Sequence, residues 1–146
     1  MISKQDFPTT NEQSQNGQKS DGSKVRVLVV DDSMFVAKQI SQILVSEGYE
    51  IIATAADGVE AVAKYKELYP NVDLVTLDIT MPRMDGITAL EQIMAFDQNA
   101  KVVMISALGK PELVKKALLT GAKNYIVKPL DRNKVLERIS SSLIKK

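Results

Sequence analysis

The sequence predicts a doubly wound α/β fold, in which a parallel sheet of five strands lies between two layers made by five helices. Short apolar runs alternate with longer stretches of helical spacing along most of the 146 residues. The runs are almost continuously apolar and rich in β-branched residues, which is typical of strands that helices cover on both faces. Strict alternation of strand and helix favours a three-layer sandwich with right-handed crossovers.

The predicted strands are the apolar runs, each of which is too short to form a helix of ordinary length. In chain order they cover residues 25–30, 51–53, 74–77, 102–105 and 125–127. Because the strands of such a sheet are parallel, their carboxyl ends all lie at the same edge.

The predicted helices lie between the strands, where apolar residues recur at spacings of three or four. The clearest sets are Val36, Ile40, Ile43 and Leu44; Val59, Val62 and Ala63; Ile87, Leu90, Ile93 and Met94; and Val135, Ile139 and Leu143. Capping residues mark helix ends. We expect a capping box at Asp57 and Glu60, N-caps at Asp85 and Asp131, a first turn at Pro111, and C-terminal ends at Gly48 and Gly121.

The composition excludes several kinds of chemistry. The chain contains no cysteine and no histidine, which rules out disulfides, zinc thiolate sites, imidazole bases and Ser-His-Asp catalysis. With 45% hydrophobic and 25% charged residues it has the composition of a globular protein. The formal net charge of +1 gives no reason to expect a nucleic-acid partner or a membrane surface.

The first 24 residues differ from the rest in composition, because Ser, Gln, Asn, Thr, Lys and Asp dominate them. We interpret residues 1–24 as a flexible or loosely docked N-terminal arm, with Phe7 as its best anchor, and residues 25–146 as one domain. The start of the chain has no apolar signal region, and no run approaches the roughly 18 apolar residues of a membrane span. We therefore expect a cytoplasmic protein without membrane insertion.

Polar side chains follow four of the predicted strands at the edge where function gathers in such sheets. Asp31 and Asp32 follow the first strand, Asp78 the third, Ser106 the fourth and Lys128 the fifth. Each has a simpler explanation, because an aspartate or serine after a strand can cap a turn and a lysine can be a solvated charge. Three carboxylates at one edge, however, would raise one another's pKa unless a cation were present. Hard oxygen ligands beside a phosphate suit Mg²⁺, so the arrangement predicts a metal and phosphate site.

Four segments that contain these strand ends form a more specific sequence pattern. They are residues 28–33 (LVVDDS), 77–86 (LDITMPRMDG), 105–107 (ISA) and 121–129 (GAKNYIVKP). In this order they resemble the response-regulator receiver domain of the chemotaxis CheY type, over about residues 25–144. The resemblance implies a flavodoxin-like sheet with strand order 2-1-3-4-5.

The resemblance also implies a role for the acidic residues. Asp78 would be the phosphoacceptor, which takes a phosphoryl group from a phosphohistidine of a histidine kinase. Asp32, Asp78 and the main-chain carbonyl of Thr80 would bind Mg²⁺ directly, and Asp31 would act mainly through water.

The remaining roles that the resemblance implies concern the phosphate and the output. Lys128 and Ser106 would each contact a phosphate oxygen, and a cis peptide bond is expected between Lys128 and Pro129. As Ser106 moves toward the phosphate, Tyr125 would turn inward behind it; without the motif, Tyr125 would be interpreted as a half-buried strand aromatic. From residue 106 to 146 the chain has ten Lys or Arg and three acids, a face suited to acidic partner segments.

The implied partners are a chemotaxis histidine kinase as donor, a flagellar motor switch protein as target and possibly a separate phosphatase. No DNA-binding or enzymatic domain is expected after the last helix, so the output is expected to be a binding event. The alternative is a stand-alone regulator in a phosphorelay outside chemotaxis.

Two alternatives of another class share some features. A haloacid-dehalogenase-like phosphatase has a second aspartate two residues after its nucleophile, where this chain has Thr80, and here the acidic pair precedes Asp78. A flavin or dinucleotide module would need a glycine-rich loop after the first strand, which this sequence lacks. We therefore expect a phosphoacceptor switch with at most slow self-dephosphorylation, and no turnover enzyme.

Overall fold

A five-stranded parallel sheet forms the centre of the protein, in a computed structural model that describes residues 17–144. The sheet has the order β2-β1-β3-β4-β5, and every neighbouring pair is parallel. Its strands are β1 (Arg26–Val30), β2 (Glu50–Ala55), β3 (Leu74–Leu77), β4 (Val102–Ser106) and β5 (Asn124–Val127). The predicted fold class and strand order are therefore confirmed.

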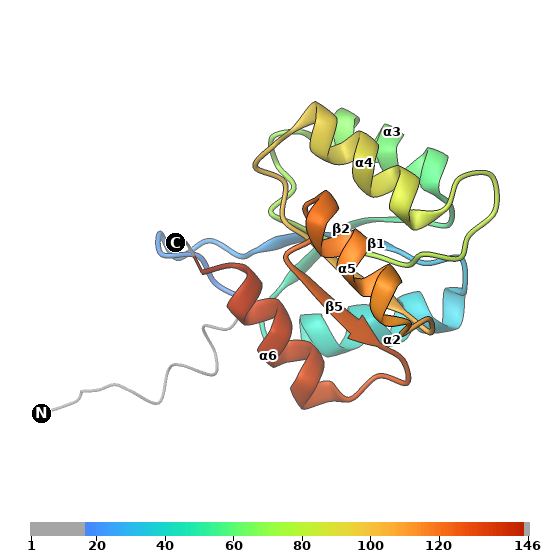
Figure 1. Cartoon of the computed structure of the whole chain (residues 1–146). Coiled ribbons are helices and arrows are strands. Elements are labelled where there is room, and N and C mark those ends of the chain that lie inside the picture. Colours follow the sequence, from blue (N-terminus) through green and yellow to red (C-terminus); the bar gives the residue numbers. More distant parts are fainter. Residues whose placement is uncertain (1–16, 145–146) are drawn as a thin grey trace, which may run out of the picture.

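Helices cover both faces of the sheet (Figure 1). Helices α3, α4 and α5 pack against one face, and α2 and α6 against the other. Their bounds are α2 (Met34–Val45), α3 (Gly58–Leu68), α4 (Gly86–Phe96), α5 (Pro111–Thr120) and α6 (Arg132–Ser142). None of these helices, nor any other within residues 17–144, is long and apolar enough to cross a membrane.

Strand β1 shows why the sequence runs are continuously apolar. Val27 and Val29 enter the core beside α2 and α6, whereas Leu28 and Val30 enter the core beside α3, α4 and α5. All four side chains are at most 1% exposed. Burial of each such side chain contributes about 1.5–3 kcal/mol, which offsets the entropy lost on folding.

Side-chain caps fix where most of the helices begin. The predicted N-caps Asp57, Asp85 and Asp131 each accept a hydrogen bond from the backbone N–H three residues later. Helix α2 is capped by Ser33, so neither Asp31 nor Asp32 serves as its N-cap. Pro111 opens α5, and Gly121, whose φ is 132°, ends it, both as predicted.

The buried stripe of α3 differs from the predicted one. The sequence suggested Val59, Val62 and Ala63, but Val59 is 39% exposed and Ala63 is exposed. The buried residues are Gly58, Ala61, Val62 and Tyr65, which have the helical spacing i, i+3, i+4, i+7. Gly58 fixes which face of α3 is buried, because it packs so closely on the Met84 backbone that a Cβ would lie 2.3 Å from the Met84 carbonyl oxygen.

Part of the predicted N-terminal arm is built into the domain. The Gly17 N–H donates to the Glu47 carbonyl, and the Val25 N–H donates to the Gly17 carbonyl. Gln18 and Lys24 form an antiparallel bridge that closes a turn between them. Residues 1–16, including the predicted anchor Phe7, lie outside the described residues.

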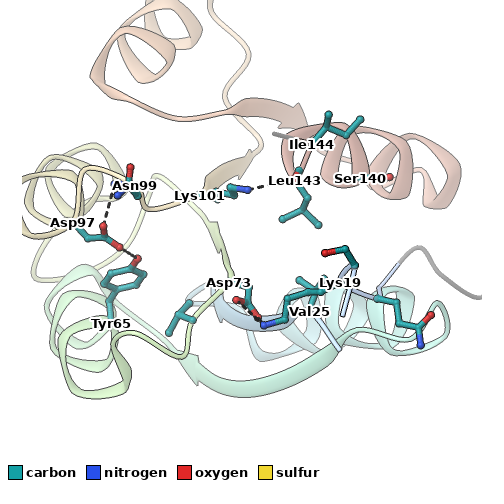
Figure 2. Close-up of a pocket in the computed structure, with 13 residues that line it drawn as sticks. Lys19, Val25, Tyr65, Asp73, Asp97, Asn99, Lys101, Ser140, Leu143 and Ile144 are labelled. Carbon is teal, nitrogen blue, oxygen red and sulfur yellow. Dashed lines mark hydrogen bonds and ion pairs between the residues drawn. The ribbon is translucent and has the colours of Figure 1, made fainter. Parts of the chain in front are cut away.

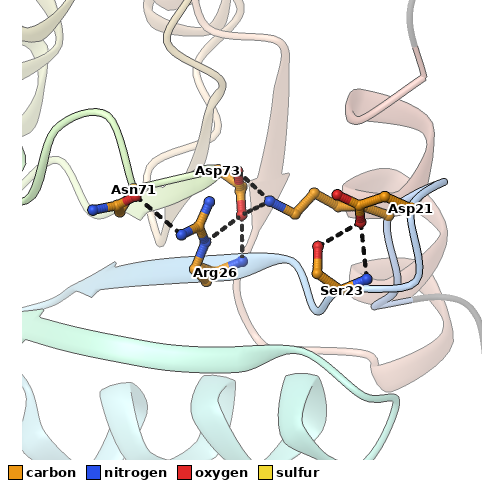
Figure 3. A network of polar contacts seen from close by, with 6 residues as sticks. Asp21, Ser23, Arg26, Asn71 and Asp73 are labelled. Atoms are coloured by element: carbon orange, nitrogen blue, oxygen red, sulfur yellow. Dashed lines mark hydrogen bonds and ion pairs between the residues drawn. The ribbon is translucent and has the colours of Figure 1, made fainter.

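The carboxylate of Asp73 joins this turn to the start of two strands (Figure 3). It accepts hydrogen bonds from the Arg26 backbone N–H at 2.8 Å and from Arg26 Nε at 3.1 Å. The Lys19 ammonium lies 3.2 Å from it, and Arg26 also reaches Asn71. Burial opposes ionisation of Asp73, but the hydrogen bonds from Arg26 and Lys19 outweigh it and hold its pKa below the ordinary value.

Removing the charge of Asp73 should destabilise the fold. A carboxylate whose pKa is lowered by folding contributes stability that is present above its unfolded pKa and lost as the pH falls through its folded pKa. We expect Asp73→Asn to lower the free energy of unfolding by about 1–2 kcal/mol at pH 7, with the difference shrinking below about pH 4. Urea unfolding across pH measures it, with Glu91→Gln on the exposed side of α4 as control; an equal loss at every pH would contradict the explanation.

The hydroxyl of Thr76 is the one buried side-chain polar atom without a hydrogen-bond partner among the described residues. Thr76 lies in the middle of β3 between Val29 and Val103 of the adjacent strands. An unpaired buried hydroxyl costs about 1–3 kcal/mol.

Replacing that hydroxyl by a methyl group should stabilise the protein. We expect Thr76→Val to raise the free energy of unfolding by about 1 kcal/mol, because the shape is kept and the desolvation cost is removed. Thr76→Ser, which keeps the hydroxyl and loses the methyl, should destabilise. Thermal and urea unfolding of both variants test this, and a destabilised Thr76→Val would mean that the hydroxyl has a partner in solution.

Candidate functional site

Three carboxylates meet at the carboxyl edge of the sheet. Asp31 and Asp32 follow β1 and Asp78 follows β3, and carboxylate oxygens of the three lie within 4.8 Å of one another. Their closeness follows from the parallel pairing of Val30 with Leu77, the last residues of the two strands. Asp31 and Asp78 are 3% and 5% exposed, whereas Asp32 is exposed. The structure therefore brings together the three acids that the sequence singled out.

Lys128 lies against this cluster from the end of β5. Its ammonium is 3.0 Å from Asp31 Oδ2 and 3.7 Å from Asp78 Oδ2. The peptide bond between Lys128 and Pro129 is cis, as predicted, and a second cis bond joins Tyr69 to Pro70. One positive charge thus compensates part of the charge of three acids.

The surroundings of Asp78 oppose its ionisation. Burial raises its pKa above the ordinary value and the charge of Asp31 raises it further, while Lys128 and the Ile79 N–H act in the opposite direction. The Ile79 N–H donates to Asp78 Oδ1 at 2.8 Å. A cation between these oxygens would relieve the repulsion, and hard carboxylate oxygens are the ligands that Mg²⁺ prefers. The donor set therefore fits the predicted ion.

Close backbone packing holds Asp78 in place. The Gly86 N–H donates to the Ile79 carbonyl at 2.7 Å. A Cβ at Gly86 would lie 1.9 Å from the Asp78 carbonyl oxygen. Only glycine fits there, so the first residue of α4 packs directly on the backbone of the central acid.

Ser106 and Tyr125 are linked through one residue of the loop after β4. Ser106 is 1% exposed, and its Oγ accepts a hydrogen bond from the Leu108 N–H at 3.0 Å. The Tyr125 hydroxyl donates to the Leu108 carbonyl, and Tyr125 is 4% exposed. Burial raises the pKa of the Tyr125 phenol, and a hydrogen bond with Ser106 acts against that increase. The Tyr125 side chain is thus buried here without a phosphoryl group, whereas the sequence led us to expect it to turn inward as Ser106 moves.

Thr80, the last of the predicted site residues, lies in the loop between β3 and α4 and is exposed. Lys128 was expected to contact phosphate, and its contacts with Asp31 and Asp78 went unpredicted because they depend on tertiary structure alone. The sequence analysis also did not predict the hydrogen bonds of Asp73, although an acid directly before a predicted strand could have indicated them.

A groove lies at the amino ends of the strands, the edge of the sheet opposite to the acids, and Figure 2 shows the residues that line it. Its volume is about 850 Å³. Tyr65 and Asp97 meet on one side of it, where the tyrosine hydroxyl donates to the carboxylate at 2.6 Å, and Leu143 and Ile144 lie on another. The shape of the surface alone would therefore not identify the acid cluster as the functional site.

Comparison with known proteins agrees with the geometry. Residues 27–140 match the model of the response regulator receiver domain family. The chemotaxis protein CheY of Treponema pallidum is 74% identical over 143 residues, which cover 98% of this chain and 99% of that protein. CheY of Bacillus subtilis is 50% identical over 118 residues, covering 81% of this chain and 97% of that protein.

A solved structure is similar over nearly the same length. It is the CheX-CheY-BeF3-Mg²⁺ complex of Borrelia burgdorferi, whose matching chain has 61% identity and a TM-score of 0.88. The match covers 91% of this chain and 99% of the other.

Removing one of the three crowded charges should stabilise the metal-free protein. Because folding raises the pKa of Asp78, its ionised form costs stability above that pKa, and the cost disappears when the pH falls below the unfolded value of about 4. We expect Asp78→Asn to raise the free energy of unfolding by about 1 kcal/mol at pH 7 without metal. Denaturant unfolding in a chelating buffer measures it, and the more exposed Asp32→Asn should show a smaller gain. A destabilised Asp78→Asn at pH 7 would contradict this electrostatic interpretation.

Proposed function

The chain belongs to the response regulator receiver domain family and is of the chemotaxis CheY type, and on this basis we propose that Asp78 is the residue phosphorylated in two-component signalling. The observation that carries the proposal is the convergence of Asp31, Asp32 and Asp78, with Lys128 beside them. A histidine kinase is the donor. The chain acts as an acceptor and switch, with at most slow self-dephosphorylation.

Asp78 is placed to act as a nucleophile. A carboxylate oxygen attacks the phosphorus of the phosphohistidine, the P–N bond breaks, and the electron pair remains on the imidazole nitrogen of the donor. Oδ1 is held by the Ile79 N–H, and Oδ2 faces Lys128. Both contacts orient the carboxylate before the phosphoryl group arrives.

The acids and Lys128 prepare the site for a phosphoryl group. Asp32, Asp78 and the main-chain carbonyl of Thr80 would hold Mg²⁺, with Asp31 acting mainly through water. The ion neutralises charge between the carboxylate and the phosphoryl oxygens when it is bound. Lys128, now paired with Asp31, would exchange part of that contact for a phosphate oxygen.

The output starts at Ser106. Its hydroxyl would leave the Leu108 N–H to contact the phosphate. Leu108 also accepts the hydrogen bond of Tyr125, so a change at this loop reaches β5. The altered surface comprises α5, β5 and α6, where basic residues favour acidic partner segments.

The proposed partners follow from the family and the relatives. They are a chemotaxis histidine kinase as donor, a flagellar motor switch protein as target and a separate phosphatase, with the protein acting in the cytoplasm. The Borrelia relative was solved as a complex with CheX, BeF3 and Mg²⁺, which supports both a protein partner of that type and the ion. The 74% identity to a chemotaxis protein favours chemotaxis over another phosphorelay.

Acetyl phosphate should phosphorylate the protein once, and only with Mg²⁺. We expect intact-mass spectrometry to find one labile phosphoryl group, absent without Mg²⁺ and absent in Asp78→Asn, because Asp31 is paired with Lys128 and Asp32 is proposed as a ligand of the ion, which leaves Asp78 as the attacking carboxylate. Asp85→Asn, at the cap of α4, is the matched control and should still be phosphorylated.

Two results would overturn the proposal. One is a phosphoryl group that persists in Asp78→Asn. The other is rapid multiple turnover of small phosphomonoesters, which would indicate a phosphatase.

A further inference from the structure

The loop between β3 and α4, residues 79–85, is anchored at its base and near its tip. At the base, the Gly86 N–H donates to the Ile79 carbonyl at 2.7 Å. Near the tip, the Gly58 N–H at the start of α3 donates to the Met84 carbonyl at 3.0 Å. Thr80 lies between the two anchors. Its backbone position therefore depends on how α3 holds the far part of the loop.

Arg83, at the tip, has an unfavourable backbone conformation. Its φ is +66°, and among the described residues it is the one non-glycine with a positive φ. The Met84 N–H donates to the Pro82 carbonyl at 2.7 Å, which closes a three-residue turn around Arg83. A glycine would adopt this conformation at lower cost. The unfavourable backbone therefore points to a role for the arginine side chain.

Arg83 contacts the residue that caps α3. Its Nε and a terminal nitrogen lie 3.0 and 2.9 Å from Asp57 Oδ2. The other oxygen of Asp57 accepts the Glu60 N–H at 2.8 Å, so one carboxylate serves both the helix and the loop. The Asp57 side chain is 13% exposed and that of Arg83 is 62% exposed.

We propose that the Arg83–Asp57 pair is a positioning device that fixes the β3–α4 loop, and with it the Thr80 carbonyl, for the metal ion. The proposal rests on the proposed function, because it concerns the ion expected at Asp32 and Asp78. Neither residue touches the ion. Their effect is to hold one oxygen ligand where it is needed before binding, so that less order has to be gained on binding.

The pair is suited to this role rather than to stabilising the fold. An ion pair in which one partner is largely exposed to solvent adds little to stability, and the positive φ of Arg83 opposes folding. Arg83→Gly removes the ion pair and relieves the backbone at the same time. A merely structural role predicts that stability and Mg²⁺ affinity change together. A positioning role predicts unchanged or higher stability with weaker Mg²⁺ binding.

The test is Mg²⁺ titration of the full-length, unphosphorylated protein, followed by amide NMR shifts. We expect Arg83→Gly and Asp57→Asn each to raise the Mg²⁺ dissociation constant about two- to fivefold, which corresponds to the interaction free energy typical of a surface ion pair. Asparagine keeps the helix cap, so Asp57→Asn removes mainly the charge. The Mg²⁺ dissociation constant of the double variant should be no higher than that of the single variants, because both substitutions break the same ion pair. In 1 M salt, the ratio of each variant's dissociation constant to that of the wild type should become smaller.

Arg132→Gln is the matched control, because Arg132 forms an ion pair of the same 2.9 Å length with Glu47, at similar exposures of 49% and 20%. It should leave Mg²⁺ affinity unchanged. Unchanged affinity in both Arg83→Gly and Asp57→Asn, while the wild type binds Mg²⁺, would overturn the positioning role alone. Failure of the wild type to bind Mg²⁺ would instead overturn the proposed function, and the inference with it.

Discussion

Asp31 and Asp78 lie side by side because β1 and β3 pair in parallel register, and the repulsion between their charges must be compensated from outside those two strands. The rest of the site depends on this constraint. Lys128 reaches the acids from the sheet edge at β5, and Gly86 allows α4 to pack directly on the Asp78 backbone. A metal ion bound between the acids would supply compensation that the protein alone does not. Without such an ion, the crowding of the acids opposes ionisation of Asp78.

The same constraint explains how chemistry at Asp78 can be sensed elsewhere. Phosphorylation of Asp78, as proposed, would change which charges Lys128 faces and would offer an acceptor to the Ser106 hydroxyl. Ser106 and Tyr125 both use Leu108 as hydrogen-bond partner. Leu108 thus connects the site to strand β5 through two hydrogen bonds, one to Ser106 and one to Tyr125.

Much of this could be predicted from sequence because the signals are local or periodic. The continuous apolar run Val27–Val30 identified a strand covered by helices on both faces. Asp85 and Asp131 identified helix starts, because an N-cap side chain bonds to the backbone only a few residues away. The acids could be grouped because strand ends in parallel sheets share an edge. What could not be predicted depends on contacts between distant segments. The burial of α3 follows a stripe set by Gly58 against Met84, and the contacts of Lys128 and Arg83 join residues far apart in the chain.

The turn at residues 17–24 is attached at the edge of the sheet opposite to the acids, through Asp73 and the backbone of Glu47. The Bacillus relative matches 81% of this chain with nearly all of its own length, so it has no counterpart for about a fifth of it. None of the hydrogen bonds and ion pairs that join this turn to the rest of residues 17–144 involves the three acids or Lys128, so substitutions in the turn should leave the acid cluster unchanged.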